Sequence, residues 1–214
     1  MKEMGNIGGY AYDDARFNAS HAYLMPAVSA ELAKLPDTPR RLFDLGCGNG
    51  SVSKACADMG WDVTGVDVSE EGIAQANTTY PELQLAFGSA YDDLAGQYGQ
   101  FSALVSLEVV EHVYDPRQYA RTVASLLDEG GTAIISTPYH GYIKNLAMAL
   151  TGKTDAHFTA LWDHGHIKFW SVKTLTLLLE EAGLIVDRFA YVGRVPPLAK
   201  SMIAIAHKPK AALS

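Results

Sequence analysis

Short apolar runs alternate with segments of helical periodicity along most of the chain. The runs expected to form strands are 42–45, 61–67, 83–87, 101–107, 132–136, 184–192 and 201–207. Between them lie stretches in which apolar residues recur every three or four positions, as along a helix with one buried face. Strands that are apolar throughout are typical of parallel sheets covered by helices on both faces. The pattern therefore predicts an α/β fold.

Residues with capping chemistry mark where several helices should begin. Ser51, Ser69 and Ser171 each stand at the start of a helical stretch, where a hydroxyl can accept a bond from a free backbone N–H. Asp115 followed by Pro116 makes an N-cap and first-turn pair. These signals place a helix after the first, second and fourth strands, and another before the last pair of strands.

Two segments stand apart from this alternation. In 1–38, a glycine-containing arm precedes near-helical spacing from Asp14 onward, and Pro26 should kink or split that helix. In 139–170, an inserted helix precedes an irregular stretch rich in polar residues. The length suffices for one α/β core, so 1–214 is expected to be a single domain with these two additions.

The charge balance and the cysteine count narrow the class of partner. The chain has 17 basic and 24 acidic side chains, a net charge of −7, and its basic clusters are limited to Arg40–Arg41 and a tail with Lys208 and Lys210. A nucleic-acid substrate is therefore not expected. The two cysteines form no disulfide framework, and neither a membrane-spanning stretch nor a signal core is present. These features predict a cytoplasmic protein without a nucleic-acid or membrane partner, and they leave its oligomeric state open.

One glycine-rich turn carries the most specific chemistry. It reads Asp44-Leu-Gly-Cys-Gly-Asn-Gly50 and joins a strand to a helix. Glycines let the backbone approach a ligand closely, and the helix N-terminus offers free N–H groups. Dinucleotide sites use the spacing G-x-G-x-x-G, whereas here the spacing is G-x-G-x-G and Ser51 takes the place of the third glycine. Asp44 would repel a pyrophosphate and suit a sulfonium cation, which favours S-adenosylmethionine over NAD.

This turn resembles the first motif of class I S-adenosylmethionine-dependent methyltransferases. Glu-Val-Val-Glu-His at 108–112 further resembles the ubiquinone-biosynthesis O-methyltransferase-like group, methyltransferase type 11/12. The resemblance covers nearly the whole chain and implies a Rossmann-like, doubly wound seven-stranded sheet of order 3-2-1-4-5-7-6 with an antiparallel last strand. It also implies an N-terminal helical lid and an insertion after strand 5. Candidate lid residues are Tyr10, Tyr12 and His21, with packing at the sheet edge as the alternative.

Further residues of the expected cofactor site follow the second, third and fourth strands. Asp67 comes about twenty residues beyond the glycines, where a carboxylate can accept both hydroxyls of a ribose. An N-cap role is the alternative, but Ser69 already caps the next helix. Family members often have an acid in place of Ser89, so the adenine contact should weaken or pass to Asp92. The residues expected to bind the cofactor are Asp44, Gly46, Cys47, Gly48, Asn49, Gly50, Asp67, Val68, Ser89, Ala90 and Leu107.

Two histidines are candidates for the group that removes a proton from the acceptor. His112 follows the fourth strand, near the expected methyl group, and imidazole titrates near neutral pH. Its alternative role is capping or packing beside Glu111. His140, at the end of the fifth strand, is the second candidate. The chain lacks the Asn/Asp-Pro-Pro-aromatic motif of many methyltransferases that act on base or amide nitrogens, which favours an oxygen acceptor.

Residues of the insertion are expected to meet the acceptor. The candidate substrate-binding residues are Tyr139, His140, Trp162, His164 and His166. A place in the core is the alternative for the aromatic rings. The histidines near Asp155, His157 and Asp163 can also bind a divalent metal, and some ubiquinone-pathway relatives use one. Because these residues match no metal motif of the family, no metal site is expected.

These features together predict methyl transfer from S-adenosylmethionine to a small molecule, preferably at oxygen, with S-adenosylhomocysteine as the product. Two alternatives stay open. One is an NAD-dependent Rossmann oxidoreductase, which the glycine spacing argues against. The other is a module that binds S-adenosylmethionine without transferring its methyl group, which the cofactor motifs do not exclude.

Overall fold

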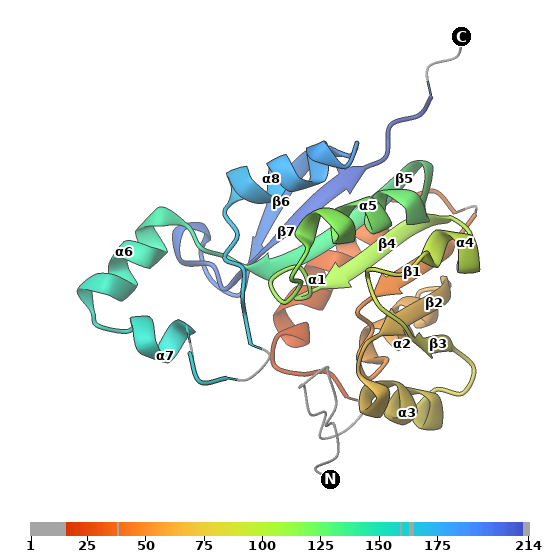
Figure 1. The fold of residues 1–214 in the computed structure, drawn as a ribbon, viewed down its shortest axis with the longest axis horizontal. Helices are drawn as coiled ribbons and strands as arrows, with labels where there is room; N and C mark the ends of the chain where they lie inside the picture. Colours follow the sequence, from red (N-terminus) through yellow and green to blue (C-terminus); the bar gives the residue numbers. More distant parts are fainter. Residues whose placement is uncertain (1–15, 38, 159, 163–164, 212–214) are drawn as a thin grey trace.

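The expected strands pair into one seven-stranded sheet of order β3-β2-β1-β4-β5-β7-β6 (Figure 1). The computed structural model describes residues 16–37, 39–158, 160–162 and 165–211. Its strands are β1 Arg41–Leu45, β2 Asp62–Asp67, β3 Gln84–Phe87, β4 Phe101–Leu107, β5 Leu127–Pro138, β6 Ile185–Val192 and β7 Ser201–His207. The five inner strands are mostly buried, because burial between two helical layers requires apolar side chains on both faces. The edge strands β3 and β6 are more exposed.

Strand direction changes toward one edge of the sheet. β1 pairs in parallel with β2 and β4, β2 with β3, and β4 with β5. β7 pairs antiparallel with both β5 and β6. The strand order reverses at β1, and ligands of open α/β sheets bind beyond the carboxyl ends of the strands at such a point. The expected α/β fold, strand order and antiparallel last strand are confirmed.

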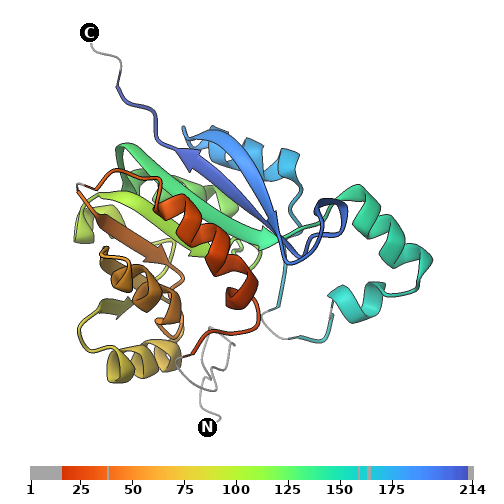
Figure 2. The same ribbon diagram turned by 180° about the vertical axis from the view of Figure 1, so that it is seen from behind.

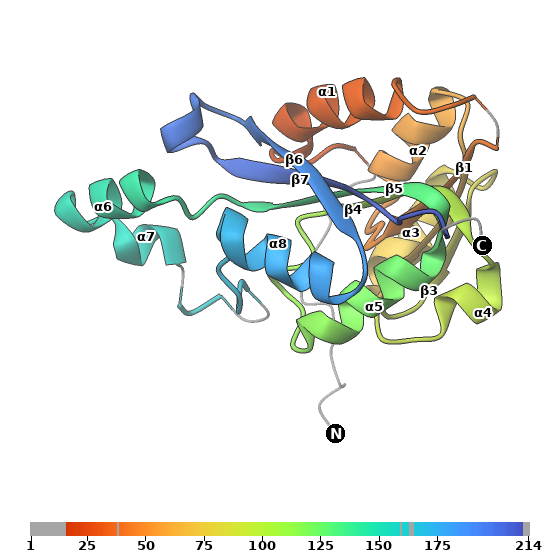
Figure 3. The same cartoon turned by 90° about the horizontal axis from the view of Figure 1, so that it is seen from above.

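Helices cover both faces of the sheet (Figure 3). One face, seen in Figure 2, carries α1 His21–Leu32, α2 Ser51–Asp58 and, beside β3, α3 Glu70–Thr79. The other face carries α4 Leu94–Tyr98, α5 Pro116–Leu126 and α8 Val172–Glu181. Within the described residues, no helix has the length and apolar character that crossing a bilayer requires.

Two large buried clusters, one on each face, hold the helices to the sheet. On one face, Tyr119 of α5 and Leu179 of α8 belong to the same cluster as Phe43 and Phe101 of the strands. On the other, the buried stripe of α1 forms a cluster with apolar residues of β4, β5 and β7. Burial of a large apolar side chain contributes roughly 1.5–3 kcal/mol, so these clusters fix the strands whose ends form the site.

The segment after β5 leaves the sheet and projects from it (Figure 1). It contains α6 (Tyr142–Leu150) and the short α7 (Thr154–Phe158), here called the α6–α7 lobe. Neither helix has a buried residue. α6 packs against the 3₁₀ turn η1 (Pro196–Leu198) between β6 and β7. The inserted helix α6 was expected, whereas α7 falls in the stretch expected to be irregular.

Some element boundaries differ from the expectation. α1 begins at His21 rather than near Asp14, and it continues through Pro26 without a break. A proline in the second turn of a helix removes one hydrogen bond, which the buried stripe of α1 compensates. β5 begins at Leu127, ahead of the expected run, and the five-residue helix α4 was not expected. The candidate lid residues Tyr10 and Tyr12 lie outside the described residues.

Candidate functional site

The glycine turn between β1 and α2 has a backbone conformation suited to glycine. The φ angles of Gly46, Gly48 and Gly50 are +89°, +52° and +77°, which side chains disfavour. A Cβ atom on Gly46 would lie 2.4 Å from Cγ2 of Val109. The loop that follows β4 therefore packs directly on the turn, which brings the ends of β1 and β4 together.

The start of α2 differs from the sequence expectation. Gly50 is the N-cap, and Ser51 is the first residue of the helix. The Ser51 hydroxyl donates to Oδ1 of Asn49 at 2.8 Å instead of accepting from the helix backbone. Asn49 in turn donates from Nδ2 to the carbonyl oxygen of Arg16 at 3.0 Å. The expected cap at Ser51 is therefore wrong, and Asn49 joins the turn to the segment that precedes α1.

Asp44 lies beneath the turn. The residue is 1% exposed, and Oδ2 accepts a hydrogen bond from the Ser53 hydroxyl of α2 at 2.6 Å. Burial raises the pKa of Asp44 to about 7, because a charge is unfavourable away from water. Cys47, in the turn itself, is buried and has a free thiol. Asp44 therefore lies behind the turn and does not reach an open surface.

Asp67 stands at the end of β2, next to the turn. Oδ2 accepts from the Gly48 N–H at 2.9 Å and Oδ1 from the Ser69 N–H at 2.8 Å. Ser69 caps α3, since its hydroxyl accepts from the Gly72 N–H at 3.1 Å. The expected cap at Ser69 is confirmed, and each oxygen of Asp67 keeps a further lone pair for a ligand hydroxyl.

The remaining candidate cofactor residues lie along the ends of β2, β3 and β4. Val68 is 39% exposed, whereas Leu107 is buried. Ala90 packs against the larger buried cluster. The Ser89 N–H donates to Oδ2 of Asp92 at 2.8 Å. The two side chains named for the adenine contact thus form one local turn after β3.

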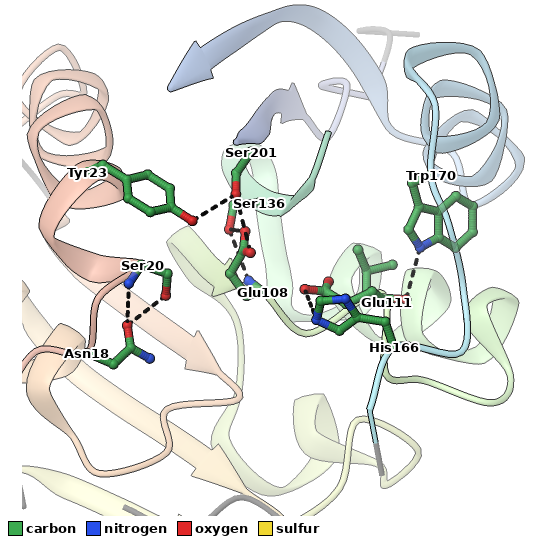
Figure 4. Close-up of polar contacts among 10 residues, drawn as sticks. Asn18, Ser20, Tyr23, Glu108, Glu111, Ser136, His166, Trp170 and Ser201 are labelled. Atoms are coloured by element: carbon green, nitrogen blue, oxygen red, sulfur yellow. Dashed lines mark hydrogen bonds and ion pairs between the residues drawn. The ribbon is translucent and has the colours of Figure 1, made fainter. Parts of the chain in front are cut away.

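Glu108, the residue after β4, holds a carboxylate that sequence analysis assigned to no role. Among the described residues, it is the one non-glycine residue with a positive φ, 56°. Its Oε1 accepts from Ser136 Oγ at 2.8 Å and its Oε2 from Ser201 Oγ at 3.3 Å, with Tyr23 Oη 3.3 Å from Ser201 Oγ (Figure 4). Burial raises the pKa of Glu108 to about 7. The Glu-Val-Val-Glu-His stretch, which in the sequence indicated only the family resemblance, was the available signal for this residue.

Glu108 lines a cavity of about 330 Å³. The cavity is lined by Tyr23, Glu108, Pro138, Lys144, His157, His166, Arg194, Lys200 and Ser201. A second cavity of about 430 Å³ shares Lys144, His157 and Arg194 with the first and extends along α6. Of the candidate substrate-binding residues, His166 lines the first cavity. The walls of the first cavity come from α1, the residue after β4, the end of β5, the α6–α7 lobe and the segment after it, the β6–β7 connection and the start of β7.

The two candidate proton acceptors, His112 and His140, lie one ring away from this cavity. The His112 ring is 4.8 Å from that of His166, and the His140 ring is 5.4 Å from that of His157, both between centroids. Burial lowers the pKa of His140 and of His166 to about 4. The rings of His140 and His166 are therefore neutral at pH 7.

The other candidate substrate-binding residues occupy separate places. Tyr139 packs its ring on Tyr191 at 5.1 Å between centroids. Trp162 meets the ring of His112 at 5.9 Å. His164 lies outside the described residues. The structure thus brings Trp162, His112 and His166 into one aromatic cluster, apart from Tyr139.

Glu111 is a second buried carboxylate beside the cavity. It is 1% exposed, and neither carboxylate oxygen has a hydrogen-bond partner. Burial and the nearby charge of Glu108 raise its pKa. Nε2 of His166 lies 3.9 Å from Oε1 (Figure 4), and with His112 the ligand-type atoms lie within 4.8 Å of one another. A carboxylate with two imidazoles is a donor set suited to a divalent metal, a grouping that the sequence analysis did not anticipate.

Comparison with known proteins finds similarity along most of the chain. The methyltransferase domain family model matches residues 17–188. A ubiquinone biosynthesis O-methyltransferase from Caulobacter sp. strain K31 is 40% identical over 57% of this chain and 48% of its own length. One from Cereibacter sphaeroides is 34% identical over 78% of this chain and 71% of its own. The chain spans about half the length of the Caulobacter relatives it matches.

Solved structures share the fold at low sequence identity. Magnesium protoporphyrin IX methyltransferase from Synechocystis PCC 6803, with bound S-adenosylhomocysteine, has a TM-score of 0.63 and 22% identity over 86% of this chain and 82% of its own. An S-adenosylmethionine-dependent methyltransferase from Mesorhizobium loti has a TM-score of 0.63 and 22% identity over 86% of this chain and 96% of its own. Both share the overall fold of this chain, and the expected family resemblance is confirmed.

Proposed function

Because the chain belongs to the methyltransferase domain family, we propose that it transfers the methyl group of S-adenosylmethionine to a hydroxyl oxygen of a small molecule. The observation that carries the proposal is the meeting of the glycine turn and Asp67 at the carboxyl edge of the sheet. The names of the O-methyltransferase relatives support oxygen as the accepting atom.

In this proposal the donor lies over the ends of β1 and β2. When bound, it supplies a methyl group carried on a positively charged sulfur. Asp67 accepts the ribose hydroxyls with its remaining lone pairs, and the first N–H groups of α2 face the same edge. Val68, Ser89 and Ala90 border the adenine, as the family resemblance implies. The G-x-G-x-G spacing, with Asp44 below it, disfavours the pyrophosphate of NAD.

We assign Glu108 as the group that accepts the proton of the acceptor hydroxyl. It lines the cavity beside the end of β4, and its pKa of about 7 suits a base at neutral pH. His112 and His140 are the other candidates. The lowered pKa of His140 makes it a weaker base. His112 does not line the cavity itself but packs against His166, which does.

The proposed step forms two bonds and breaks two. The acceptor oxygen takes the methyl carbon as the bond from that carbon to sulfur breaks, and the sulfur keeps the electron pair. The hydroxyl proton passes to a carboxylate oxygen of Glu108. The chain contributes by holding oxygen, carbon and sulfur in line, at about 3 Å between the reacting atoms, and by excluding water.

Calorimetry with the folded chain tests the donor assignment. We expect saturable binding of S-adenosylhomocysteine and none of NAD, because the turn lacks the third glycine of a pyrophosphate site. Binding of NAD instead would favour the oxidoreductase alternative. Binding of S-adenosylhomocysteine, with no methyl transfer to any of a broad panel of hydroxyl and amine acceptors, would favour a binding module.

Substitution of Glu108 tests the acceptor side. We expect Glu108→Gln to lower kcat by about 100-fold or more, since a positioned base contributes on the order of 10²–10⁴ in rate. Binding of S-adenosylhomocysteine should be unchanged. Glu180→Gln on the exposed side of α8 is the matched control. A larger loss in His112→Ala than in Glu108→Gln would move the role of base to His112.

A further inference from the structure

We propose that the methyl acceptor carries an acidic group, a carboxylate or a phosphate, and that Lys144, Arg194 and Lys200 bind this group in the cavity beside Glu108. This inference rests on the proposed methyl transfer and specifies the class of its acceptor. It turns on the charge of the cavity, which is opposite in sign to that of the chain as a whole.

The cavity concentrates positive charge in an acidic protein. Its lining holds three cationic side chains and one carboxylate, that of Glu108, whereas the chain has a net charge of −7. The second cavity adds Lys153 and no acidic residue. Across the described part of the chain, none of these four cations forms an ion pair with a carboxylate. The charge of Glu108 acts on Lys144 without a direct contact, so an anion in the cavity would meet cations that no carboxylate of the described residues contacts.

Two of the cations are held toward the cavity by contacts with uncharged groups. The side chain of Lys200 lies across Gly193, where an added Cβ would be 2.8 Å from its Cβ atom. Its ammonium stands 5.0 Å from the centroid of the Tyr23 ring. Lys144 donates to the carbonyl oxygens of Tyr139 and Lys200 at 2.7 and 3.3 Å. Ordering the side chains before binding reduces the entropy lost when an anion arrives.

The cations also disfavour one another in the absence of an anion. Burial and the charge of Arg194 lower the pKa of Lys144. A carboxylate or phosphate between them would reverse this effect, because opposite charges within a few ångströms favour the charged form of each group. Arginine and lysine together offer the donors that such groups accept in charge-assisted hydrogen bonds.

The remainder of the acceptor has an apolar wall to contact. Ala147, Met148 and Leu198 line the second cavity next to the cations. A hydroxylated acid with a small apolar skeleton matches this arrangement, with its acidic group at Lys144 and Arg194 and its hydroxyl at Glu108. Specificity for an acid over its neutral analogue then depends on the cations alone.

Equilibrium binding to the full chain saturated with S-adenosylhomocysteine tests the proposal. The probes are benzoate and phenyl phosphate, with benzamide as the neutral analogue of benzoate. We expect at least one acid to bind about tenfold or more tightly than benzamide, since charge-assisted bonds strengthen binding to that extent. Arg194→Gln and Lys144→Met should each lower acid binding toward that of benzamide. Arg121→Gln on α5 and Lys173→Met on α8 are the matched controls.

The outcomes separate this inference from the methyl-transfer proposal. Equal binding of acids and benzamide, or no saturable binding of either acid up to about 10 mM, overturns the acidic acceptor while S-adenosylhomocysteine still binds. Acid binding that the two cavity variants leave unchanged also overturns it. Absence of S-adenosylhomocysteine binding by the folded chain contradicts the proposed function instead. A preference for phenyl phosphate over benzoate would assign the group as phosphate, and the reverse as carboxylate.

Discussion

Four carboxylates gather near the ends of β1, β2 and β4, of which Asp44 and Glu111 are buried and Asp67 and Glu108 are partly buried. Burial raises the pKa of Asp44, Asp67, Glu108 and Glu111. Such a group of acids is costly for the folded state, because each must either lose hydration or keep a proton. Cationic partners relieve this cost. The positively charged sulfur of the proposed donor is a group of this kind, and the charge of Lys144 acts in the same direction on Glu108.

The buried acids predict how stability changes with pH. The pKa of Asp44 rises from 3.8, and that of Glu108 from 4.5, to about 7 in the folded chain. The folded chain thus retains protons that the unfolded chain has lost. Their contribution to stability is fully present below pH about 4 and is lost as the pH rises to about 7. Urea unfolding across this range should therefore show a decreasing free energy of unfolding.

The variant Asp44→Asn should flatten part of that decrease, because it removes one of the acids whose pKa is raised. Asp62→Asn on the same sheet replaces an exposed acid and serves as the control. An identical pH dependence in Asp44→Asn and in the unmodified chain would contradict a raised pKa at Asp44.

Asp67 is expected to control binding of the donor. Asp67→Ala should weaken S-adenosylhomocysteine binding at least tenfold, since hydrogen bonds to a charged group contribute about 1.5–3 kcal/mol. Asp67→Asn keeps one acceptor oxygen, so its affinity for S-adenosylhomocysteine should lie between those of Asp67→Ala and the unmodified chain. This intermediate affinity separates loss of the ribose contact from disturbance of Gly48. Calorimetry measures both, with Asp62→Ala as the control. Unchanged affinity in Asp67→Ala would remove this residue from the site.

At the scale of elements, the sequence predicted best where chemistry within a few residues decides the conformation. Ser69, Asp115 and Ser171 cap α3, α5 and α8 as expected, since each cap contacts an N–H only three residues away. The predicted cap at Ser51 was wrong because Gly50, with its positive φ, is the N-cap of α2, one residue earlier. The helix α4 was missed since five residues are too few to display helical periodicity.

The cap of α8 allows a direct measurement. Ser171 and Thr174 form a capping box, in which each side chain accepts a hydrogen bond from the backbone of the other. Ser171→Ala should lower the free energy of unfolding by about 1 kcal/mol. Thr78→Ala near the end of α3 removes a hydroxyl that bonds to the carbonyl of Ala74 and caps nothing, so its effect should be near zero. Equal losses in the two variants in chemical denaturation would argue against a capping contribution.

At the scale of the whole molecule, the candidate site is the part that sequence patterns predicted least. The strand order follows from family resemblance and apolar runs, and the turn with Asp67 follows from their spacing. The cavity does not, because Glu108 contacts Ser136 of β5 and Ser201 of β7, and Ser201 in turn contacts Tyr23 of α1. These contacts join residues 28 to 178 positions apart. Periodicity along the sequence does not reveal contacts between residues so far apart. The surroundings of Glu108 form only when the strands of the sheet have paired.

The fold also distributes stability unevenly between the sheet and the α6–α7 lobe. Ile134 of β5 is fully buried, with 0% exposure, whereas Leu150 of α6 is 79% exposed. Ile134→Ala should therefore lower the free energy of unfolding by about 2–5 kcal/mol, because it leaves a cavity in the core. Leu150→Ala should change the free energy of unfolding by no more than about 0.5 kcal/mol. Thermal unfolding followed by circular dichroism measures both, and the midpoint should fall by several degrees in the first variant alone. A comparable fall in Leu150→Ala would mean that the lobe is part of the cooperative core, and α6 would then need a partner surface that its exposed side chains do not have in this structure.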